Sequence, residues 1–189
     1  MLAGLKYNFC LVYIDDIIVY SEDLASHADH LDQVLTRVED AGLRLKAEKC
    51  RIAVEELKFL GHIVGPGTLR ADPKKVSALS EYPAPTSKPL LQRFLGIINF
   101  NRDYVQGFAK EAYPLYQLLR DDTPWLWDEQ CQLGFESLRA ILAQNVTLHM
   151  WDEVSPLVIA CDASKYGLGA SLSMLKDGKR VPLAFASKA

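Results

Sequence analysis

The sequence predicts an α+β fold, in which short strands form both ends of the chain and helices form its middle. Two β-rich runs, residues 9–14 and 17–20, flank a pair of aspartates near the amino terminus, a pattern typical of a hairpin. Residues 72–142 carry apolar side chains at helical spacing, and after residue 156 the apolar period becomes two. These stretches of strand and helix pattern together predict an α+β fold.

The composition excludes several classes of protein. The 189 residues carry a formal net charge of −3, so any contact with a phosphate backbone has to come from local Lys and Arg residues. The four cysteines form no C-x-x-C pair, which argues against a zinc knuckle or a disulfide framework and predicts buried free thiols. The apolar stretch at residues 9–20 is short and holds two aspartates, so it predicts neither a membrane span nor a signal peptide.

The first 70 residues predict strands around one helix. The aspartate pair predicts a tight turn between the first two strands. An amphipathic helix is predicted from about residue 26 to residue 41, and Gly42 follows as its stop. Two further short strands are predicted at residues 51–54 and 59–64, and glycines punctuate the second.

The remaining 119 residues predict helices followed by strands. Asp72 and Pro73 form a favourable helix start, and residues 82–85 form a stiff linker with two prolines. The later elements follow in order: helices capped at Thr86 or Ser87, at 109–119, and from Asp128 to about 142, then strands at 157–162, 169–175 and 181–186. Asp177 and Gly178 predict a hairpin between the last two strands.

The adjacent carboxylates of Asp15 and Asp16 are the sharpest chemical signal. Carboxylates in an apolar setting need a partner, and two neighbouring carboxylates oppose each other's ionisation. A divalent cation removes that conflict, and hard oxygen ligands suit Mg²⁺. Spacing alone leaves open the alternative that the pair is a solvent-exposed turn, where aspartate is common.

Several motifs in a fixed order extend this evidence over almost the whole chain. Tyr13-Ile-Asp-Asp16 and the Ile-Ile-Val-Tyr-Ser that follows resemble the catalytic palm motif of reverse transcriptases, in the form found in Ty3/Gypsy-class long-terminal-repeat retrotransposons. Other stretches resemble that family's palm helix, a lysine-bearing motif, the hairpin that grips the primer, the thumb and its connection, and the first strands of an RNase H-like domain: residues 27–34, 41–50, 59–62, 95–104, 114–119 and 161–170. The chain resembles a piece of the reverse transcriptase/RNase H region of a Pol polyprotein.

The resemblance implies three parts. Residues 1–70 would be the C-terminal part of a polymerase palm, a β-hairpin plus helix with a primer-grip-like hairpin. Residues 71–124 would be a helical thumb and connection, and residues 125–189 the start of an RNase H-like α/β domain. The implied activity is RNA-directed DNA polymerisation with two Mg²⁺ ions, an RNA/DNA template-primer and deoxynucleotides. The rest of the Pol polyprotein is a further expected partner, without a membrane, in a cytoplasmic or nuclear setting associated with virus-like particles.

The resemblance also implies roles for single residues. Asp15 would be the main magnesium ligand of the palm and Asp16 a weaker one. Lys49 matches the lysine thought to protonate the leaving pyrophosphate, although a solvated surface lysine is the alternative. The residues expected at the primer are Tyr13, Phe59, Leu60, Gly61 and Arg102. Gly61 would allow a close approach that a side chain would block.

For several other positions the sequence allows two interpretations, one as a binding residue and one as a structural or surface residue. Lys88 and Arg93 are candidates for phosphate contacts from the thumb, or solvated helix charges. The pair His27 and His30 shares a helix face and could bind a metal, or could be polar residues of a surface helix. The tryptophans at 125 and 127 could stack on bases, or anchor a loop.

The resemblance further predicts incomplete active sites. Asp162 matches the first carboxylate of an RNase H metal site, which needs several carboxylates around two ions. The palm would need another aspartate and the fingers from upstream, so we expect no efficient polymerisation by the chain alone. Open strand edges and an open apolar face are expected in the first and last strands. The alternatives are a non-catalytic remnant that binds nucleic acid or a partner, and a small hydrolase that uses Asp162.

Overall fold

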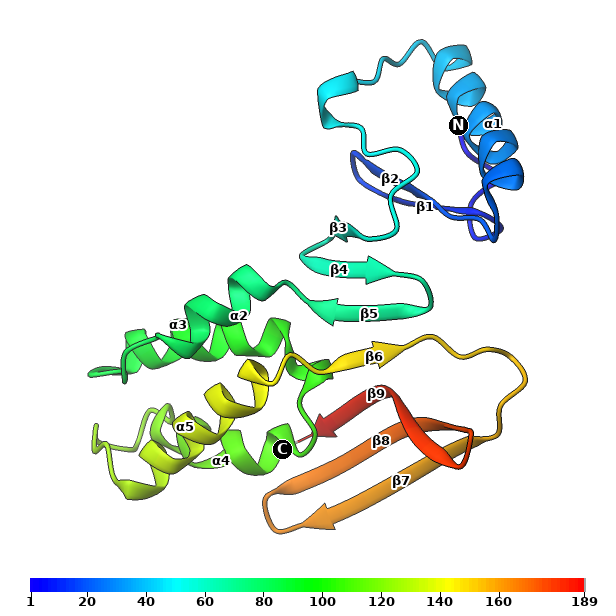
Figure 1. The fold of residues 1–189 in the computed structure, drawn as a ribbon. Helices are drawn as coiled ribbons and strands as arrows, with labels where there is room; N and C mark the ends of the chain where they lie inside the picture. Colours follow the sequence, from blue (N-terminus) through cyan, green and yellow to red (C-terminus); the bar gives the residue numbers. More distant parts are fainter. Residues whose placement is uncertain (189) are drawn as a thin grey trace. The chain divides into compact units, whose positions relative to one another are not determined.

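A computed structural model describes residues 1–188 and divides the chain into two compact units, Met1–Leu60 and Gly61–Ala189. The elements of the first unit are β1 (Cys10–Tyr13), β2 (Asp16–Val19), α1 (Leu24–Asp40), the short 3₁₀ helix η1 (Ala47–Lys49) and β3 (Leu57–Phe59). Strands β1 and β2 pair as an antiparallel hairpin, and α1 lies against it (Figure 1). This unit confirms the predicted hairpin and helix.

The core of the first unit lies between the hairpin and α1. It is formed by buried apolar residues from the amino-terminal turns, β1 and α1: Leu2, Leu5, Cys10, Val34 and Val38. The helix begins earlier than predicted, because the carboxylate of Asp23 accepts a hydrogen bond from the Ser26 backbone N–H at 2.8 Å and caps it. That bond lowers the pKa of Asp23.

The strand predicted at residues 51–54 is wrong. These residues are irregular in the structure, although Ile52 and Val54 favour strands. Ala53 has a φ of 52°, which breaks an extended run. Isoleucine and valine here lack a neighbouring strand with which to pair.

The second unit holds a three-stranded antiparallel arrangement, a helical module and a separate sheet. Its elements are β4 (His62–Gly65), β5 (Thr68–Ala71), α2 (Pro73–Ser80), α3 (Lys88–Phe100), η2 (Arg102–Tyr104), α4 (Phe108–Leu118), α5 (Glu129–Ala143), β6 (Thr147–His149), β7 (Leu157–Ser164), β8 (Gly167–Lys176) and β9 (Lys179–Lys188). Strand β5 pairs with β4 on one side and with β6 on the other. The β5 and β6 strands were not predicted, whereas all four helices were.

The helical module has one apolar core that α2, α3, α4 and α5 share (Figure 1). Its most deeply buried side chains include Leu79, Leu91, Phe94, Ile98, Leu115, Phe135 and Leu138. Helix α5 is capped by Asp128, whose carboxylate accepts from the Cys131 N–H at 2.9 Å. The core therefore includes residues on both sides of position 124. The division of the chain at residues 70 and 124 into three domains stays a prediction.

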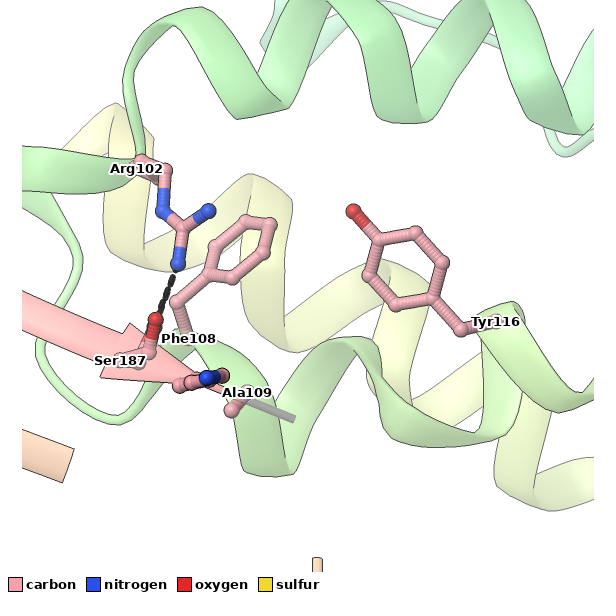
Figure 2. Close-up of a pocket in the computed structure, with 6 residues that line it drawn as sticks. Arg102, Phe108, Ala109, Tyr116 and Ser187 are labelled. Atoms are coloured by element: carbon pink, nitrogen blue, oxygen red, sulfur yellow. Dashed lines mark hydrogen bonds between the residues drawn. The ribbon is translucent and has the colours of Figure 1, made fainter. Parts of the chain in front are cut away.

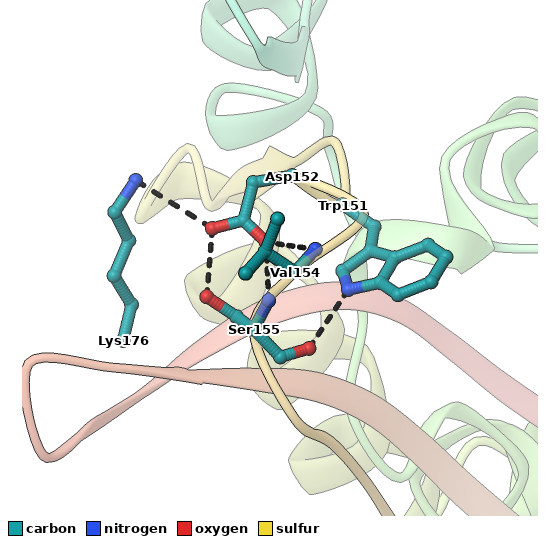
Figure 3. A network of polar contacts seen from close by, with 5 residues as sticks. All are labelled: Trp151, Asp152, Val154, Ser155 and Lys176. Carbon is teal, nitrogen blue, oxygen red and sulfur yellow. Dashed lines mark hydrogen bonds and ion pairs between the residues drawn. The ribbon is translucent and has the colours of Figure 1, made fainter.

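Strands β7, β8 and β9 form the separate antiparallel sheet. Asp177 and Gly178 join β8 to β9 with positive φ at both positions, as a type I′ turn requires, which confirms the predicted hairpin. Ile159 is 70% exposed and Leu168 58% exposed, in line with the expected open apolar face. On the way into this sheet, Asp152 organises a turn by accepting hydrogen bonds from Ser155 (Figure 3).

Two sequence predictions concern the whole chain. Within residues 1–188 the structure has no helix long and apolar enough to cross a membrane. The cysteines are free, and Cys10 and Cys131 are buried as predicted, whereas Cys161 on β7 is exposed. Burial raises the pKa of Cys131 to about 11, so this thiol stays protonated at neutral pH.

Candidate active site at the Tyr13–Asp16 turn

The turn between β1 and β2 is fixed by the strand register. Tyr13 pairs with Asp16, so Ile14 and Asp15 are its two central residues and Asp16 is the first residue of β2. The turn was predicted at the aspartate pair and lies one residue earlier. Ile14 has a φ of 54° and is 79% exposed, a left-handed conformation that is rare for a β-branched residue.

The turn presents two consecutive carboxylates at an exposed position. Asp15, Asp16 and Tyr13 are all exposed to solvent. Among residues 1–188, no group of three or more His, Cys, Asp or Glu side chains is arranged to hold a metal ion. Magnesium is commonly bound by one or two carboxylates together with water and substrate phosphates. The donor chemistry of this turn therefore fits part of a magnesium site, with the other ligands to come from elsewhere.

His30 of α1 contacts the base of the hairpin. The ring of His30 stacks on that of Phe9, which precedes β1, with centroids 3.9 Å apart and an interplanar angle of 3°. Ser21, which follows β2, has its hydroxyl 2.8 Å from Nδ1 of His30 and 3.1 Å from Nδ1 of His27. Both histidines thus contact the hairpin ends, a support that sequence spacing did not reveal.

Two other candidates of the first unit stand apart from these contacts. Lys49 ends η1 and is exposed, and its side chain makes no hydrogen bond or ion pair with a described residue. Phe59 is half-buried at the end of β3. Leu60 and Gly61, which join β3 to β4, have φ values of 49° and 83°. Two positive φ values in succession define a tight connection, for which glycine is suited at the second position.

Gly61 is closely surrounded by its own chain. A Cβ added to Gly61 would stand 2.7 Å from Nζ of Lys75 and 2.9 Å from Cζ of Phe100. The space at this glycine is therefore filled by two side chains from α2 and α3.

His62, the next residue, is joined to the helical module. Its Nδ1 lies 2.8 Å from the hydroxyl of Tyr104, and its ring stacks on Phe100 with centroids 5.1 Å apart. Burial lowers the pKa of His62, and the charge of Lys75 lowers it further, against a smaller opposite effect of Asp103. Burial raises the pKa of Tyr104 to about 12. At neutral pH the hydrogen bond therefore joins two uncharged groups.

Arg102 borders a cavity of about 430 Å³ in the second unit. Its guanidinium donates to the backbone carbonyl of Ser187 on β9 and lies over the ring of Phe108, with the Tyr116 ring across the cavity (Figure 2). These contacts give Arg102 a structural role between η2 and β9. Lys88 is also engaged, because its Nζ donates to the carbonyl oxygen of Arg120 at 2.5 Å.

Known families match both ends of the chain. Residues 1–64 match the family described as reverse transcriptase (RNA-dependent DNA polymerase). Residues 127–189 match the RNase H-like domain found in reverse transcriptase. The chain belongs to the reverse transcriptase/RNase H region of retrotransposon Pol proteins. This confirms the resemblance inferred from the ordered motifs.

Relatives of this reverse transcriptase segment include two Pol polyproteins of Drosophila melanogaster. The retrovirus-related Pol polyprotein from transposon opus is 38% identical over 190 residues, which cover 95% of this chain and 19% of the relative. That from transposon gypsy is 35% identical over 178 residues, which cover 88% of this chain and 17% of the relative. The chain thus spans less than a fifth of the length of these relatives.

Solved structures of foamy viral protease-reverse transcriptase share the fold. One, of the dRH form in complex with double-stranded DNA, has a TM-score of 0.82 at 25% identity and covers 100% of this chain and 33% of that chain. Another, in complex with an RNA/DNA hybrid, has a TM-score of 0.77 at 25% identity and covers 95% of this chain and 24% of that chain. The α+β class is therefore confirmed.

In the RNase H-like part of this reverse transcriptase segment, Asp162 is exposed on β7 opposite Gly169 of β8. It joins no metal-binding group among the described residues. Trp127 packs edge-on against Phe135, and its Nε1 donates to the Gln132 side chain at 2.7 Å. Trp125 lies 5.8 Å from Trp127 between ring centroids. The two tryptophans therefore anchor the loop before α5.

Proposed function

We propose that this chain carries the metal-binding turn of an RNA-directed DNA polymerase, and that Asp15 and Asp16 hold magnesium there. The observation that supports the proposal is the β1–β2 register, in which Asp15 lies in an exposed turn and Asp16 follows as the first residue of β2, next to Ile14 with its positive φ. The substrates would be an RNA/DNA template-primer and deoxynucleotides. Magnesium, when bound, supplies positive charge that stabilises the phosphate oxygens of the reacting groups.

The candidate residues of the first unit would act on the two ends of the reaction. The primer 3′-hydroxyl gives up its proton to water and attacks the α-phosphorus of the nucleotide, and the bond to pyrophosphate breaks. Asp15 and Asp16 contribute carboxylate oxygens as ligands on the side of the turn that faces solvent. Tyr13, 54% exposed beside them, would pack against the primer terminus. Lys49 would give a proton to the leaving pyrophosphate, for which its uncommitted ammonium is suited.

Other residues would bind the primer strand. Phe59, Leu60 and Gly61 form the tight connection that we assign to the primer, and Arg102 would contact a phosphate with the part of its guanidinium that Ser187 leaves open. The foamy viral reverse transcriptases of the same fold are in complex with double-stranded DNA and with an RNA/DNA hybrid, which supports a nucleic-acid duplex as the ligand.

The carboxy-terminal part would serve an RNase H-like domain. Asp162 would provide one carboxylate of a two-ion site, whose other ligands must come from outside the described residues. The rest of a Pol polyprotein is therefore the proposed protein partner, in a cytoplasmic or nuclear setting. A small hydrolase built on Asp162 alone has no support, because a single carboxylate cannot hold two ions.

Metal binding at the turn can be tested on the full chain with Mn²⁺ as a paramagnetic probe. Substoichiometric Mn²⁺ is expected to broaden the amide signals of residues 13–17 first, and the double variant Asp15→Asn/Asp16→Asn is expected to abolish that broadening. Asp121→Asn/Asp122→Asn is the matched control, because it removes another exposed pair of adjacent aspartates. Equal broadening in wild type and in the Asp15/Asp16 variant would sink the proposed metal site.

Polymerase activity needs a second experiment. In a chimera, this chain replaces the matching 190 residues of the opus Pol relative, and extension of a labelled primer on an RNA template is measured with Mg²⁺. We expect extension by the chimera and none by its Asp15→Ala variant, while Asp121→Ala extends normally. A folded chimera that binds the duplex but never extends it would favour the alternative of a nucleic-acid-binding segment.

A further inference from the structure

The connection at Gly61 carries a positive charge from another element. The ammonium of Lys75, in the first turn of α2, lies 2.7 Å from the position that a Cβ of residue 61 would take. Phe100 of α3 fills the adjoining space at 2.9 Å. A strand that approaches Gly61 therefore meets the Lys75 ammonium and the Phe100 ring edge, in addition to the backbone.

The ring of Phe100 lies against this ammonium. Nζ of Lys75 lies 4.3 Å from the centroid of the Phe100 ring, a cation–π contact that restricts the long side chain. Phe100 in turn stacks on His62 at 5.1 Å and 11°. The ammonium is thus kept beside residue 61 without using its three N–H donors.

The charge of Lys75 is not neutralised by the fold. Within residues 1–188, Lys75 forms no ion pair and no hydrogen bond with another side chain. Its place in the first turn of a helix is electrostatically unfavourable, because that end of the helix macrodipole favours anions. The carboxylate of Asp72 already caps this end of α2, so an anion here would gain from the ammonium of Lys75.

Two of the other candidate cations of this unit each already give a donor to the fold. Lys88 donates to the Arg120 carbonyl, and Arg102 donates to Ser187 on β9. Lys75 differs because its ammonium is positioned and its donors remain available.

We propose that Lys75 binds a backbone phosphate of the nucleic-acid strand that lies along the Gly61 connection. Gly61 is then required for two reasons, its positive φ and the room it leaves for the ammonium. The inference rests on the proposed function, since it assumes that a template-primer duplex is the ligand, and it adds the residue that meets the phosphate.

The test measures binding of a fluorescently labelled RNA/DNA hybrid to the full chain by anisotropy over a range of KCl concentrations. Lys75→Gln is expected to weaken binding and to lower the slope of log K against log salt by about 1, the value for one lost phosphate contact. Lys75→Arg keeps the charge and is expected to keep most of the slope. Lys74→Gln is the matched control, because Lys74 is the neighbouring residue, is also exposed and carries the same charge. This variant is expected to leave the slope unchanged.

A double-mutant cycle links Lys75 to Gly61. Gly61→Ala displaces the ammonium and is expected to weaken binding, and Gly61→Ala/Lys75→Gln is expected to bind no more weakly than the weaker single variant. Circular dichroism and urea unfolding identify any variant that fails to fold, and Lys75→Gln, on an exposed side chain, keeps the test independent of Gly61.

If the wild type binds the hybrid and Lys75→Gln shows the same slope as Lys74→Gln, the inference about Lys75 is overturned while the proposed function stands. If the folded wild type does not bind the hybrid at low salt, the proposed function fails for this chain, and the inference with it.

Discussion

Gly134 of α5 lies against the backbone of Glu111 in α4, where a Cβ on residue 134 would stand 2.5 Å from the Glu111 carbonyl oxygen. A backbone oxygen cannot rotate away as a side chain can. Gly134→Ala is therefore expected to push α4 and α5 apart over a core that includes Leu115 and Phe135. The expected loss of stability is about 1–3 kcal/mol, measured by urea unfolding.

The control for this substitution is Gly96→Ala. Gly96 is an exposed residue of α3, and a Cβ there would have nothing within 4 Å. Alanine is favoured over glycine in a helix interior by about 1 kcal/mol, so this variant is expected to gain stability. Similar losses in both variants would show that the close packing of α4 and α5 is not the cause.

Because His62 is partly buried and hydrogen-bonded to Tyr104, we expect acid to destabilise the second unit at pH values higher than those at which carboxylates take up protons. Burial lowers the pKa of His62 below 6.5 in the folded chain, so the unfolded chain takes up its proton first. The unit therefore has its full stability above pH 6.5 and loses it as pH falls from 6.5 through the folded pKa of His62. The free energy of unfolding at about pH 7.5 and about pH 5.5 measures this loss, and His62→Gln is expected to reduce it.

Tyr104→Phe separates the hydrogen bond from the protonation. It removes the hydroxyl at 2.8 Å from His62 Nδ1 and is expected to cost about 1 kcal/mol at either pH. The pH dependence itself should persist, since burial is its main cause. A His62→Gln variant as acid-sensitive as the wild type over this range would contradict the assignment to His62.

Local patterns were sufficient for the parts of the fold whose stabilising contacts are local. The type I′ turn at Asp177 and Gly178 and the helix cap at Asp128 depend on neighbouring residues, and the sequence predicted both. Strand β6 was missed because it has only three residues and pairs with β5, about 80 residues earlier in the chain. The strand at 51–54 was predicted from β-prone residues and is absent because Ala53 takes a positive φ.

In the candidate site, too, local motifs were predicted from the sequence and contacts between distant residues were not. The aspartates of the turn and the connection at Gly61 were recognised from short motifs. The stacking of His30 on Phe9 and the contact of Lys75 with Phe100 depend on the tertiary fold, since each joins residues from separate elements. Arg102 was expected at the primer from its motif alone, and only the fold shows that its guanidinium reaches β9.

The turn before β7 predicts one unusually acidic carboxyl group. Two hydrogen bonds from Ser155, one from its hydroxyl and one from its backbone N–H, lower the pKa of Asp152 to about 2, and the charge of Lys176 contributes least (Figure 3). Ser155→Ala removes the larger effect and is expected to raise this pKa toward the ordinary 3.8. Lys176→Gln is expected to raise it less. An NMR titration of the Asp152 side-chain carbon measures the pKa in each variant, and the reverse order of the two shifts would contradict this account.

The residue with a positive φ in the Tyr13–Asp16 turn gives the last prediction. Ile14 has a φ of 54° and an exposed side chain, so its branched Cβ opposes the backbone conformation without gaining burial. Asparagine tolerates a left-handed φ, and Ile14→Asn is therefore expected to stabilise the first unit by about 1 kcal/mol in thermal or urea unfolding. Ile52→Asn is the control, because Ile52 is also exposed but its φ is not positive, and a change within about 0.5 kcal/mol is expected there.

Since native turns near reacting groups often retain such strain, a stabilised Ile14→Asn variant that has lost Mn²⁺ broadening at residues 13–17 would tie the strain to the placement of Asp15. Destabilisation by Ile14→Asn would instead show that the left-handed isoleucine is not strained.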